Sequence, residues 1–248
     1  MKERVTLTIE ASVLRQVDAR VDQNTIRNRS HAVELLLREA LRGSIPETAI
    51  ILAGSRETQI QRVLSKHKEQ PILQHNIELL LQAGVQNIYI ITSKPQQLQE
   101  TIPEYEEIRY LTETTPLGTA GALHLASPYI ETSFLVLNAD DYKELSLQDM
   151  YAFHTSHAGL CSIALTTTNN PEKYGVALLN GNKIITFIEK PSQKAPSNLI
   201  SAGCYIMQPE ALELIPEGYA TLETDLFPKL TQTDNLYGYP FSGEYKHL

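Results

Sequence analysis

The chain has 248 residues, of which 42% are hydrophobic and 20% charged, and its formal net charge is −8. This length suffices for a full hydrophobic core, and the composition excludes wholesale disorder. No stretch approaches the roughly 18 apolar residues of a membrane span, and we expect no signal peptide. Cys161 and Cys204 lie far apart in apolar contexts, which predicts neither a disulfide framework nor a cysteine metal cluster but a cytoplasmic location.

The charge is divided unevenly along the chain. Residues 1–43 carry eight basic and six acidic side chains, whereas residues 44–248 carry 13 basic and 23 acidic ones. Gly43 is suited to end a helix, and Pro46 prevents it from restarting. We therefore expect a small domain over residues 1–43, a linker over residues 44–47 and a large domain over residues 48–248. The arginine-rich small domain is expected to face an anion.

The first 43 residues have the pattern of one strand and two helices. Polar and apolar side chains alternate over Arg4–Glu10, which predicts a half-buried strand, and two amphipathic stretches follow, the second with Ser30 as its expected N-cap. Such a unit is too small to bury enough surface alone, and its single strand leaves both edges unpaired. Pairing with the same strand of a second copy would resolve both problems, so we expect at least a homodimer.

This pattern resembles the ribbon-helix-helix DNA-binding family over residues 2–42. In that family a β-ribbon enters the major groove of double-stranded DNA, while the start of the second helix holds a phosphate. The alternative is a dimerisation module with a merely solvated polar face. The resemblance implies base contacts from Arg4, Thr6 and Thr8 and backbone contacts from Asn28, Arg29 and Ser30.

Strands and helices alternate along the rest of the chain, which predicts a doubly wound, Rossmann-like α/β domain with a mixed sheet. In such a sheet the ligand lies at the carboxyl ends of the strands. His154 and His157 are expected on a solvated helix face. The predicted helices are Ile72–Gln82, Gln96–Thr101 and Gly118–Leu125. The predicted strands are Ala49–Ala53, Asn87–Thr92, Ile108–Leu111, Phe134–Leu137, Cys161–Thr166, Tyr174–Leu179, Lys183–Ile188 and Ile200–Met207.

Several short motifs follow these strands in a specific order. Residues 50–54 run a strand into a glycine turn, residues 115–123 form a glycine-rich helix entry, and residues 134–141 end a strand in two carboxylates. Tyr174-Gly-Val176, Glu189-Lys-Pro191 and residues 198–203 come next. Each motif alone is weak evidence, but together they resemble the sugar-1-phosphate nucleotidyltransferase family, the nucleoside-diphosphate-sugar pyrophosphorylases, across nearly all of residues 48–248.

Members of that family join a nucleoside triphosphate to a sugar 1-phosphate and release pyrophosphate, with magnesium. The resemblance implies a role for specific residues of this chain. Asp140 would bind the metal. The nucleotide would be bound by Leu52, Ala53, Gly54, Gly118, Thr119 and Gly121, and the sugar and its phosphate by Gly175, Glu189 and Lys190.

The sequence also departs from the family pattern. The first loop lacks two glycines, and Gln59 stands where the family has an arginine that neutralises the triphosphate. A Pro-Lys-Pro lysine is missing as well, and substitutes for these cations could come from Arg56, Lys66 or Lys68. His247 falls where the second metal aspartate is expected, and Ser201 replaces an asparagine. With Asp140 alone we expect weak Mg²⁺ binding, and no residue is assigned as catalytic.

These observations allow three hypotheses. The main one is a DNA-binding transcriptional regulator whose nucleotidyltransferase-like domain senses a nucleotide, sugar phosphate or nucleotide sugar, with catalysis lost. The alternative is an active sugar-1-phosphate nucleotidyltransferase with a DNA-binding or dimerising N-terminal module. The third is an antitoxin-like repressor whose large domain meets a protein partner.

Overall fold

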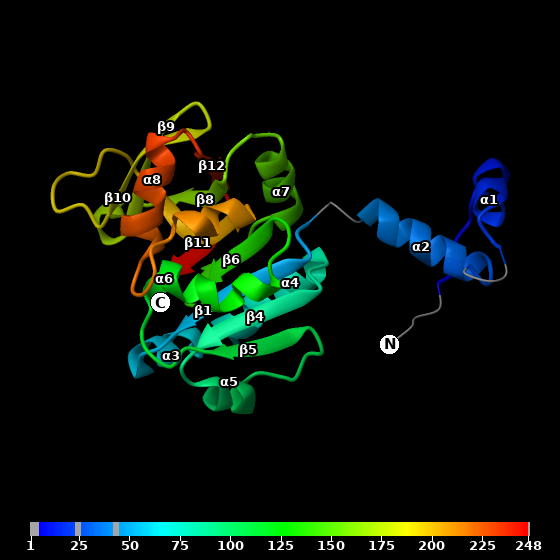
Figure 1. The fold of residues 1–248 in the computed structure, drawn as a ribbon, viewed down its shortest axis with the longest axis horizontal. Coiled ribbons are helices and arrows are strands. Elements are labelled where there is room, and N and C mark those ends of the chain that lie inside the picture. Colours follow the sequence, from blue (N-terminus) through cyan, green and yellow to red (C-terminus); the bar gives the residue numbers. More distant parts are fainter. Residues whose placement is uncertain (1–4, 23–25, 42–44, 248) are drawn as a thin grey trace. The chain divides into compact units, whose positions relative to one another are not determined.

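The computed structural model describes residues 5–22, 26–41 and 45–247. The chain divides into two compact units, Met1–Ser44 and Ile45–Leu248, each of which is considered by itself (Figure 1). Within the described ranges, no helix is both long enough and apolar enough to cross a membrane. Cys161 and Cys204 are buried, free thiols.

The N-terminal unit contains the helices α1 (Ala11–Asp18) and α2 (Arg29–Leu41). Val17 of α1 and Ala32 of α2 are buried, and the Arg29 Nε donates a hydrogen bond of 2.6 Å to Asp18 Oδ1. This ion pair joins the two helices, because Asp18 is the last residue of α1 and Arg29 the first of α2.

Several details of this unit differ from the sequence-based expectation. Residues 5–10 have no regular secondary structure and pair with no strand in the described part of the chain, so no ribbon is shown. The second helix begins two residues earlier than predicted, and Asn28 rather than Ser30 provides the cap, since its Oδ1 accepts from the His31 amide at 2.9 Å. Thr6 and Thr8 are exposed, whereas Arg4 lies outside the described residues.

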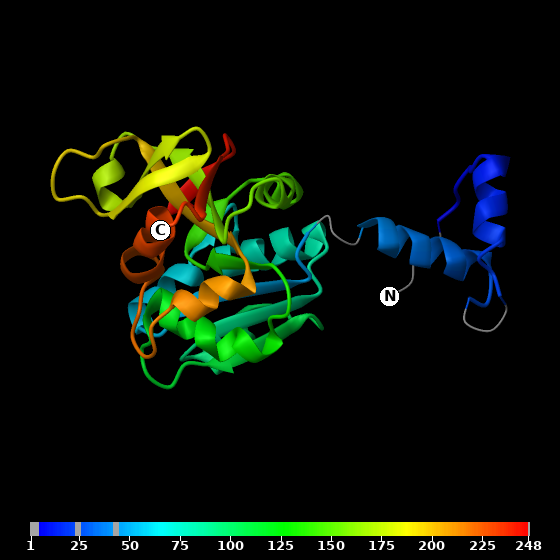
Figure 2. The same ribbon diagram turned by 45° about the horizontal axis from the view of Figure 1, so that its top comes forward.

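A nine-stranded mixed sheet forms the centre of the large unit (Figure 2). Its strand order is β5-β4-β1-β6-β11-β8-β12-β10-β9. The first four strands in this order are parallel, and β11 runs antiparallel to both β6 and β8. The strands are β1 (Thr48–Gly54), β4 (Asn87–Thr92), β5 (Ile108–Thr112), β6 (Phe134–Asn138), β8 (Cys161–Thr167), β9 (Gly175–Asn180), β10 (Lys183–Glu189), β11 (Leu199–Met207) and β12 (Leu236–Pro240).

Every strand predicted in the large domain is confirmed to within one residue at each end. The predictions omitted β12 and two short ribbons. One ribbon pairs β7 (Asp141–Lys143) with β13 (Tyr245–His247), and the other pairs β2 (Lys66–His67) with β3 (Gln70–Pro71). Strands of two or three residues are too short to show a periodic pattern, which explains the omission.

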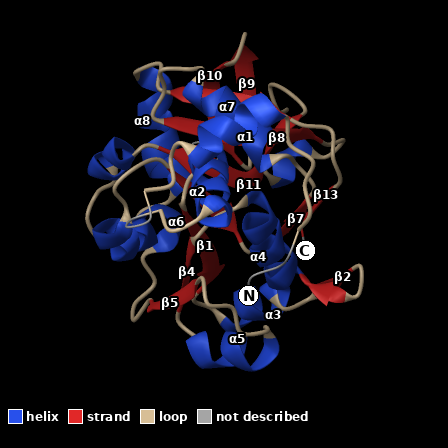
Figure 3. Ribbon diagram, turned by 90° about the vertical axis from the view of Figure 1, so that its right-hand side faces the viewer, coloured by secondary structure: helices blue, strands red, loops and turns tan. Residues whose placement is uncertain are grey.

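Helices cover both faces of the sheet (Figures 2 and 3), so the doubly wound architecture is confirmed. Neighbouring residues of β1 point to opposite sides, with Ile50 in one core cluster and Ile51 in the other. Residues of α3 (Glu57–Val63), α4 (Ile72–Ala83), α5 (Pro95–Thr101) and α7 (Leu147–Thr155) pack in the Ile51 cluster. The Ile50 cluster contains residues of α6 (Gly118–Gly121), α8 (Phe227–Gln232), a π-helical turn (Leu222–Leu226) and the 3₁₀ helices Ala122–Tyr129 and Pro209–Leu214; a third 3₁₀ turn is Pro171–Lys173.

One histidine of α7 is buried rather than solvated. His154 is 1% exposed, with its Nδ1 2.9 Å from Ser162 Oγ and its Nε2 3.0 Å from Gln208 Nε2. The Gln208 amide nitrogen can only donate, so the ring is neutral and carries its proton on Nδ1. Burial lowers the pKa of His154 to about 4. The expectation of a solvated face is therefore wrong for this residue.

His154 makes stability depend on pH. Its pKa is lowered in the folded state, so the unfolded chain takes up the proton first as the pH falls below about 6.5. We expect this residue to cost about 3 kcal/mol of stability as the pH falls from about 6.5 to about 4. Thermal unfolding of His154→Gln should show a shallower loss of stability over this range than the parent chain. Parallel curves for the two proteins would contradict the assignment.

Candidate functional site

A cavity of about 340 Å³ opens at the carboxyl ends of the parallel strands. Strands β1, β4 and β6 end side by side at Gly54, Thr92 and Asn138, because β1 pairs in parallel with both neighbours. Among the residues that line the cavity are predicted site residues of the nucleotide, sugar and metal groups: Leu52, Ala53, Gly54, Gly118, Thr119, Asp140, Gly175, Glu189 and Lys190. Gly121 is not among them, and a Cβ at this position would lie 2.2 Å from the Gly218 carbonyl oxygen. Its glycine therefore serves close backbone packing.

The loop after β1 is held together by Gln59. Its Oε1 accepts hydrogen bonds from the amides of Ser55 at 3.1 Å and Arg56 at 3.0 Å. Gly54 has a φ of 82°, and a Cβ there would lie 2.7 Å from the Gln59 Cβ, so the side chain requires a glycine at this turn. Gln59, which replaces the family's arginine, is thus a structural part of the loop.

A cation does reach the cavity from the same helix. Arg62 lines it one turn of α3 after Gln59, together with Gly54 and Ser55. Arg56, Lys66 and Lys68, the substitutes considered from the sequence, are not among the lining residues. Lys68 instead bridges Glu144 at 2.8 Å and Glu244 at 2.7 Å. The i, i+3 spacing from Gln59 was the signal that could have identified Arg62, because such residues share a helix face.

Two carboxylates missed at the sequence level flank the glycine-rich helix entry. Glu113 is 6% exposed and lines the cavity, and its Oε1 accepts from the Leu117 amide at 2.7 Å. Glu223 Oε2 accepts from Thr119 Oγ1 at 2.9 Å, and burial raises the pKa of Glu223. Neither residue belongs to one of the motifs recognised in the sequence. The fold, rather than a sequence pattern, places both beside the glycine-rich helix entry.

The opposite end of the cavity holds Gly175, Glu189 and Lys190. The Lys190 Nζ lies 3.1 Å from Glu189 Oε1, and its side chain is 67% exposed. A Cβ at Gly175 would lie 2.4 Å from Phe187 Cζ and 3.0 Å from Glu189 Oε2. Glycine at this position therefore leaves room for the Glu189 carboxylate beside the cavity.

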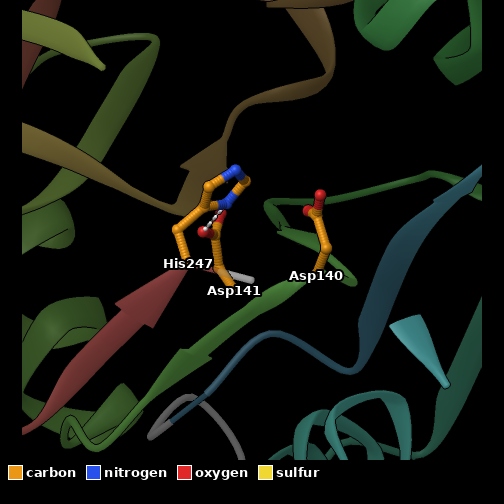
Figure 4. A group of neighbouring side chains, drawn as sticks. All are labelled: Asp140, Asp141 and His247. Atoms are coloured by element: carbon orange, nitrogen blue, oxygen red, sulfur yellow. Dashed lines mark hydrogen bonds and ion pairs between the residues drawn. The ribbon is translucent and has the colours of Figure 1, made fainter. Parts of the chain in front are cut away.

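Asp140, Asp141 and His247 form a group whose ligand atoms lie within 4.8 Å of one another (Figure 4). The β7–β13 ribbon places His247 directly opposite Asp141, and the His247 Nδ1 lies 2.9 Å from Asp141 Oδ1. Burial, and next the charge of Asp141, raise the pKa of Asp140. The hydrogen bond that His247 donates to Asp141 raises the pKa of His247. Asp140, which was expected to bind Mg²⁺ weakly if it acts alone, therefore has two further possible ligands beside it.

Contacts from α4 fix the segment that carries these carboxylates. The buried Asn76 donates from Nδ2 to the carbonyl oxygens of Ala139 and Asp141, both at 3.2 Å. Lys143 is fully buried, and its Nζ donates to the Asn138 carbonyl oxygen at 3.3 Å. Burial lowers the pKa of Lys143. Such a supported segment can hold Asp140 in one position, as a metal or substrate ligand requires.

The residues present fit a divalent cation, which the family resemblance implies. Two carboxylates and an imidazole meet in one group, and these are donor types that bind divalent metals. Gly203 has a φ of 61°, and a Cβ there would lie 2.0 Å from Asp141 Oδ2. Asn138 Oδ1 is buried with no hydrogen-bond partner among the described residues. Gly203 thus makes room for the Asp141 carboxylate, and the Asn138 Oδ1 is a further oxygen that could bind a metal.

Comparison with known proteins identifies the family. Residues 51–245 match the family described as nucleotidyl transferase. The chain belongs to this family. Its fold also resembles that of a putative glucose-1-phosphate thymidylyltransferase from Bacillus anthracis, with a TM-score of 0.68 at 20% identity over 81% of this chain and 89% of that one. HddC from Yersinia pseudotuberculosis gives a TM-score of 0.67 at 25% identity, over 81% and 92% of the two chains.

Relatives with higher identity carry the name of an enzyme. Mannose-1-phosphate guanyltransferase 2 of Candida glabrata is 35% identical over 213 residues, which cover 78% of this chain and 59% of the relative. Mannose-1-phosphate guanyltransferase of Saccharomyces cerevisiae is 33% identical over the same shares. The catalytic subunit beta of Drosophila melanogaster mannose-1-phosphate guanylyltransferase is 34% identical, over 79% and 57%. The chain thus spans less than two thirds of the length of these relatives.

These relatives overturn the main hypothesis. A DNA-binding transcriptional regulator with lost catalysis conflicts with the enzyme names, and the family match begins at residue 51, outside the region expected to bind DNA. The ribbon-helix-helix resemblance receives no support. The physical reason for the error is that the sequence pattern treats each expected position separately. In the structure, Arg62 lines the cavity from another position, and Asp141 and His247 join Asp140 in the metal group.

Proposed function

We propose that the chain is an active sugar-1-phosphate nucleotidyltransferase. The observation that carries this proposal is one cavity lined by both the nucleotide-side loops and the sugar-side Glu189 and Lys190, with Asp140 among the lining residues. In the reaction, a phosphate oxygen of the sugar 1-phosphate attacks the α-phosphorus of the triphosphate in line. The bond from the α-phosphorus to the α,β-bridging oxygen breaks, and pyrophosphate leaves with that oxygen.

Each end of the cavity has its own task in this reaction. The Gly54 loop and Arg62 receive the triphosphate, and Lys190 holds the sugar phosphate for attack. Glu189 accepts hydrogen bonds from sugar hydroxyls. Asp140 and His247 would hold the divalent cation, which when bound neutralises the negative charge on the transferred phosphoryl group.

We propose guanine as the base and mannose 1-phosphate as the sugar substrate, as in the names of the relatives. Glu113 supports guanine on chemical grounds. Guanine presents two adjacent donors, N1–H and N2–H, which one carboxylate can accept together, whereas the corresponding edges of adenine, cytosine and uracil include an acceptor beside the donor. A buried carboxylate at the nucleotide end of the cavity therefore favours guanine.

Product formation tests the proposed function directly. The full chain is incubated with each nucleoside triphosphate in turn, with mannose 1-phosphate and either Mg²⁺ or Mn²⁺. Pyrophosphate release and the mass of the nucleotide sugar are measured, with glucose 1-phosphate as the comparison sugar. We expect GDP-mannose from GTP. If folded protein releases no pyrophosphate with any pair, the proposal fails.

Arg62 is expected to bind the triphosphate. Replacing it with methionine removes the charge but keeps a long side chain, and we expect the KM for the nucleotide to rise roughly 30-fold, because a hydrogen bond to a charged group is lost. Arg56→Met is the matched control, since Arg56 belongs to the same segment but does not line the cavity. Steady-state kinetics at saturating sugar 1-phosphate measure both. Equal KM values for the two variants would contradict the role of Arg62.

We also propose that the N-terminal unit associates with a second copy of itself. Val5 and Leu7 are 69% and 59% exposed, and the described residues 5–10 pair with no other strand. Two such segments could pair and bury these side chains together. Val5→Asp combined with Leu7→Asp should lower the molar mass seen by light scattering, whereas Thr6→Asp with Thr8→Asp should not. A monomeric parent chain would refute the proposal.

A cytoplasmic location is proposed from the thiols. Cys161 and Cys204 are free, and burial raises the pKa of both, that of Cys204 to about 11. Free thiols of this kind are typical of a reducing compartment. Fractionation of cells that produce the protein, with detection by antibody, would test this.

A further inference from the structure

We propose that His247 is a direct metal ligand, oriented by Asp141, and that this makes the site favour Mn²⁺ over Mg²⁺. The proposal deepens the proposed function, because the metal group borders the same cavity. It concerns the departure of this chain from the two-aspartate pattern that the family resemblance implies. Three observations carry it: the direction of the two side chains, the hydrogen bonds of Asp141, and the chemistry of imidazole.

The geometry leaves one ring nitrogen of His247 available. Nδ1 faces Asp141 Oδ1 at 2.9 Å, so Nε2 is the nitrogen that remains for a ligand. In Figure 4, this second nitrogen and the carboxylate of Asp140 point to the same side of the site. Both residues line the cavity. A cation between them would therefore meet one carboxylate and one imidazole nitrogen.

Asp141 is already engaged in orienting its neighbours. It is 4% exposed, and its Oδ1 accepts from the Tyr245 hydroxyl at 2.9 Å as well as from His247. A carboxylate that accepts from Nδ1–H fixes the tautomer with a free lone pair on Nε2. Metal-binding histidines usually have such a carboxylate behind them, which fixes the ring and makes it a stronger donor. Asp141 is thus a positioning residue, and Asp140 and His247 are the ligands.

The exchange of a carboxylate for an imidazole changes the preferred metal. Mg²⁺ is a hard cation that binds oxygen ligands and gives up water reluctantly. An imidazole nitrogen suits first-row transition metals better, and Mn²⁺ accepts both oxygen and nitrogen donors. Replacing the aspartate expected at position 247 with histidine therefore shifts the site away from Mg²⁺. The competing explanation is that Asp141 and His247 merely form an ion pair that stabilises the β7–β13 ribbon.

Direct metal binding separates these explanations. The full chain without substrates is titrated with Mn²⁺, and free Mn²⁺ is measured by electron paramagnetic resonance, with Mg²⁺ as competitor. Spin-echo modulation then reports whether a ¹⁴N nucleus is directly coordinated. We expect a ¹⁴N signal in the parent chain and none in His247→Asp or His247→Gln. In His247→Asp, the ratio of the Mg²⁺ to the Mn²⁺ dissociation constant should fall roughly tenfold.

Asp141→Asn tests the positioning role, because asparagine can still accept from Nδ1–H but lacks the charge. We expect Mn²⁺ to bind roughly 10- to 100-fold more weakly with the ¹⁴N signal retained. Asp149→Asn, an exposed aspartate of α7, is the control and should bind as the parent chain does. Absence of saturable Mn²⁺ binding, absence of the ¹⁴N signal, or an equal metal ratio in His247→Asp would overturn the proposal. None of these readouts needs turnover, so an inactive chain that shows the signal would refute the proposed function alone.

Discussion

Asp140→Asn is expected to lower kcat by about a thousandfold, which corresponds to about 4 kcal/mol of transition-state stabilisation. Asp140 lies between β6 and β7 and lines the cavity. Asn76 and Lys143 donate hydrogen bonds to the backbone of its segment and hold it in place. Asparagine keeps the shape of the side chain but removes the charge that a divalent cation needs. Steady-state rates of pyrophosphate release with Mn²⁺ and with Mg²⁺ measure the effect.

The stability of the same variant distinguishes a functional role from a structural one. Burial and the neighbouring charge of Asp141 raise the pKa of Asp140, so its ionised form is disfavoured in the folded protein. Replacing it with a neutral side chain should leave the melting temperature unchanged or raise it. Asp149→Asn should change neither rate nor stability. A lower melting temperature together with lost activity would show that Asp140 acts on folding instead.

The strands could be predicted because their signal is local. Buried parallel strands are continuous apolar runs, as in Asn87–Thr92, whose bounds agree with β4. The helix expected at Gly118–Leu125 was found as one α-helical turn followed by a 3₁₀ helix, because its glycines favour no long helix and Pro128 interrupts the later backbone bonds. His154 was misjudged because its partners, Ser162 and Gln208, come from two other segments.

The site could be predicted where a residue lies at the end of a strand or just after it, as Gly54 of β1 and Asp140 after β6 do. Contacts that form only in the folded chain could not be predicted. His247 meets Asp141 through a three-residue ribbon, and these residues are 106 positions apart in the chain. Arg62 lines the cavity because it lies on the same face of α3 as Gln59, whose side chain is bonded to the loop after β1.

The same distinction applies to the charged groups that the sequence departures seem to remove. Each missing group was counted at its expected position, although electrostatic stabilisation depends on where charges lie in space. The structure supplies cations at both ends of the cavity, Arg62 near the first loop and Lys173 with Lys190 near the sugar side. A catalytic site can therefore keep its charge balance while its sequence pattern changes.

Glu113→Gln is expected to lower kcat/KM for GTP by about a hundredfold. The neutral amide can still accept from the Leu117 amide through Oε1, so the loop should keep its shape. The NH₂ group of the glutamine, however, would face the N–H groups of guanine, so two donors would oppose each other. The negative charge of the Glu113 carboxylate is lost as well. Hydrogen bonds to charged groups contribute about 1.5–3 kcal/mol, and an opposed donor pair adds to that loss.

Inosine triphosphate shows which part of guanine Glu113 recognises, since it lacks the 2-amino group but keeps N1–H. The parent chain should prefer GTP to ITP roughly tenfold, and Glu113→Gln should reduce this preference toward equality because the acceptor for the amino group is gone. Glu104→Gln, an exposed glutamate of the preceding turn, is the matched control and should behave as the parent chain. Unchanged GTP kinetics in Glu113→Gln would show that the base binds elsewhere in the cavity, and an equal loss for GTP and ITP would place N1–H alone against the carboxylate.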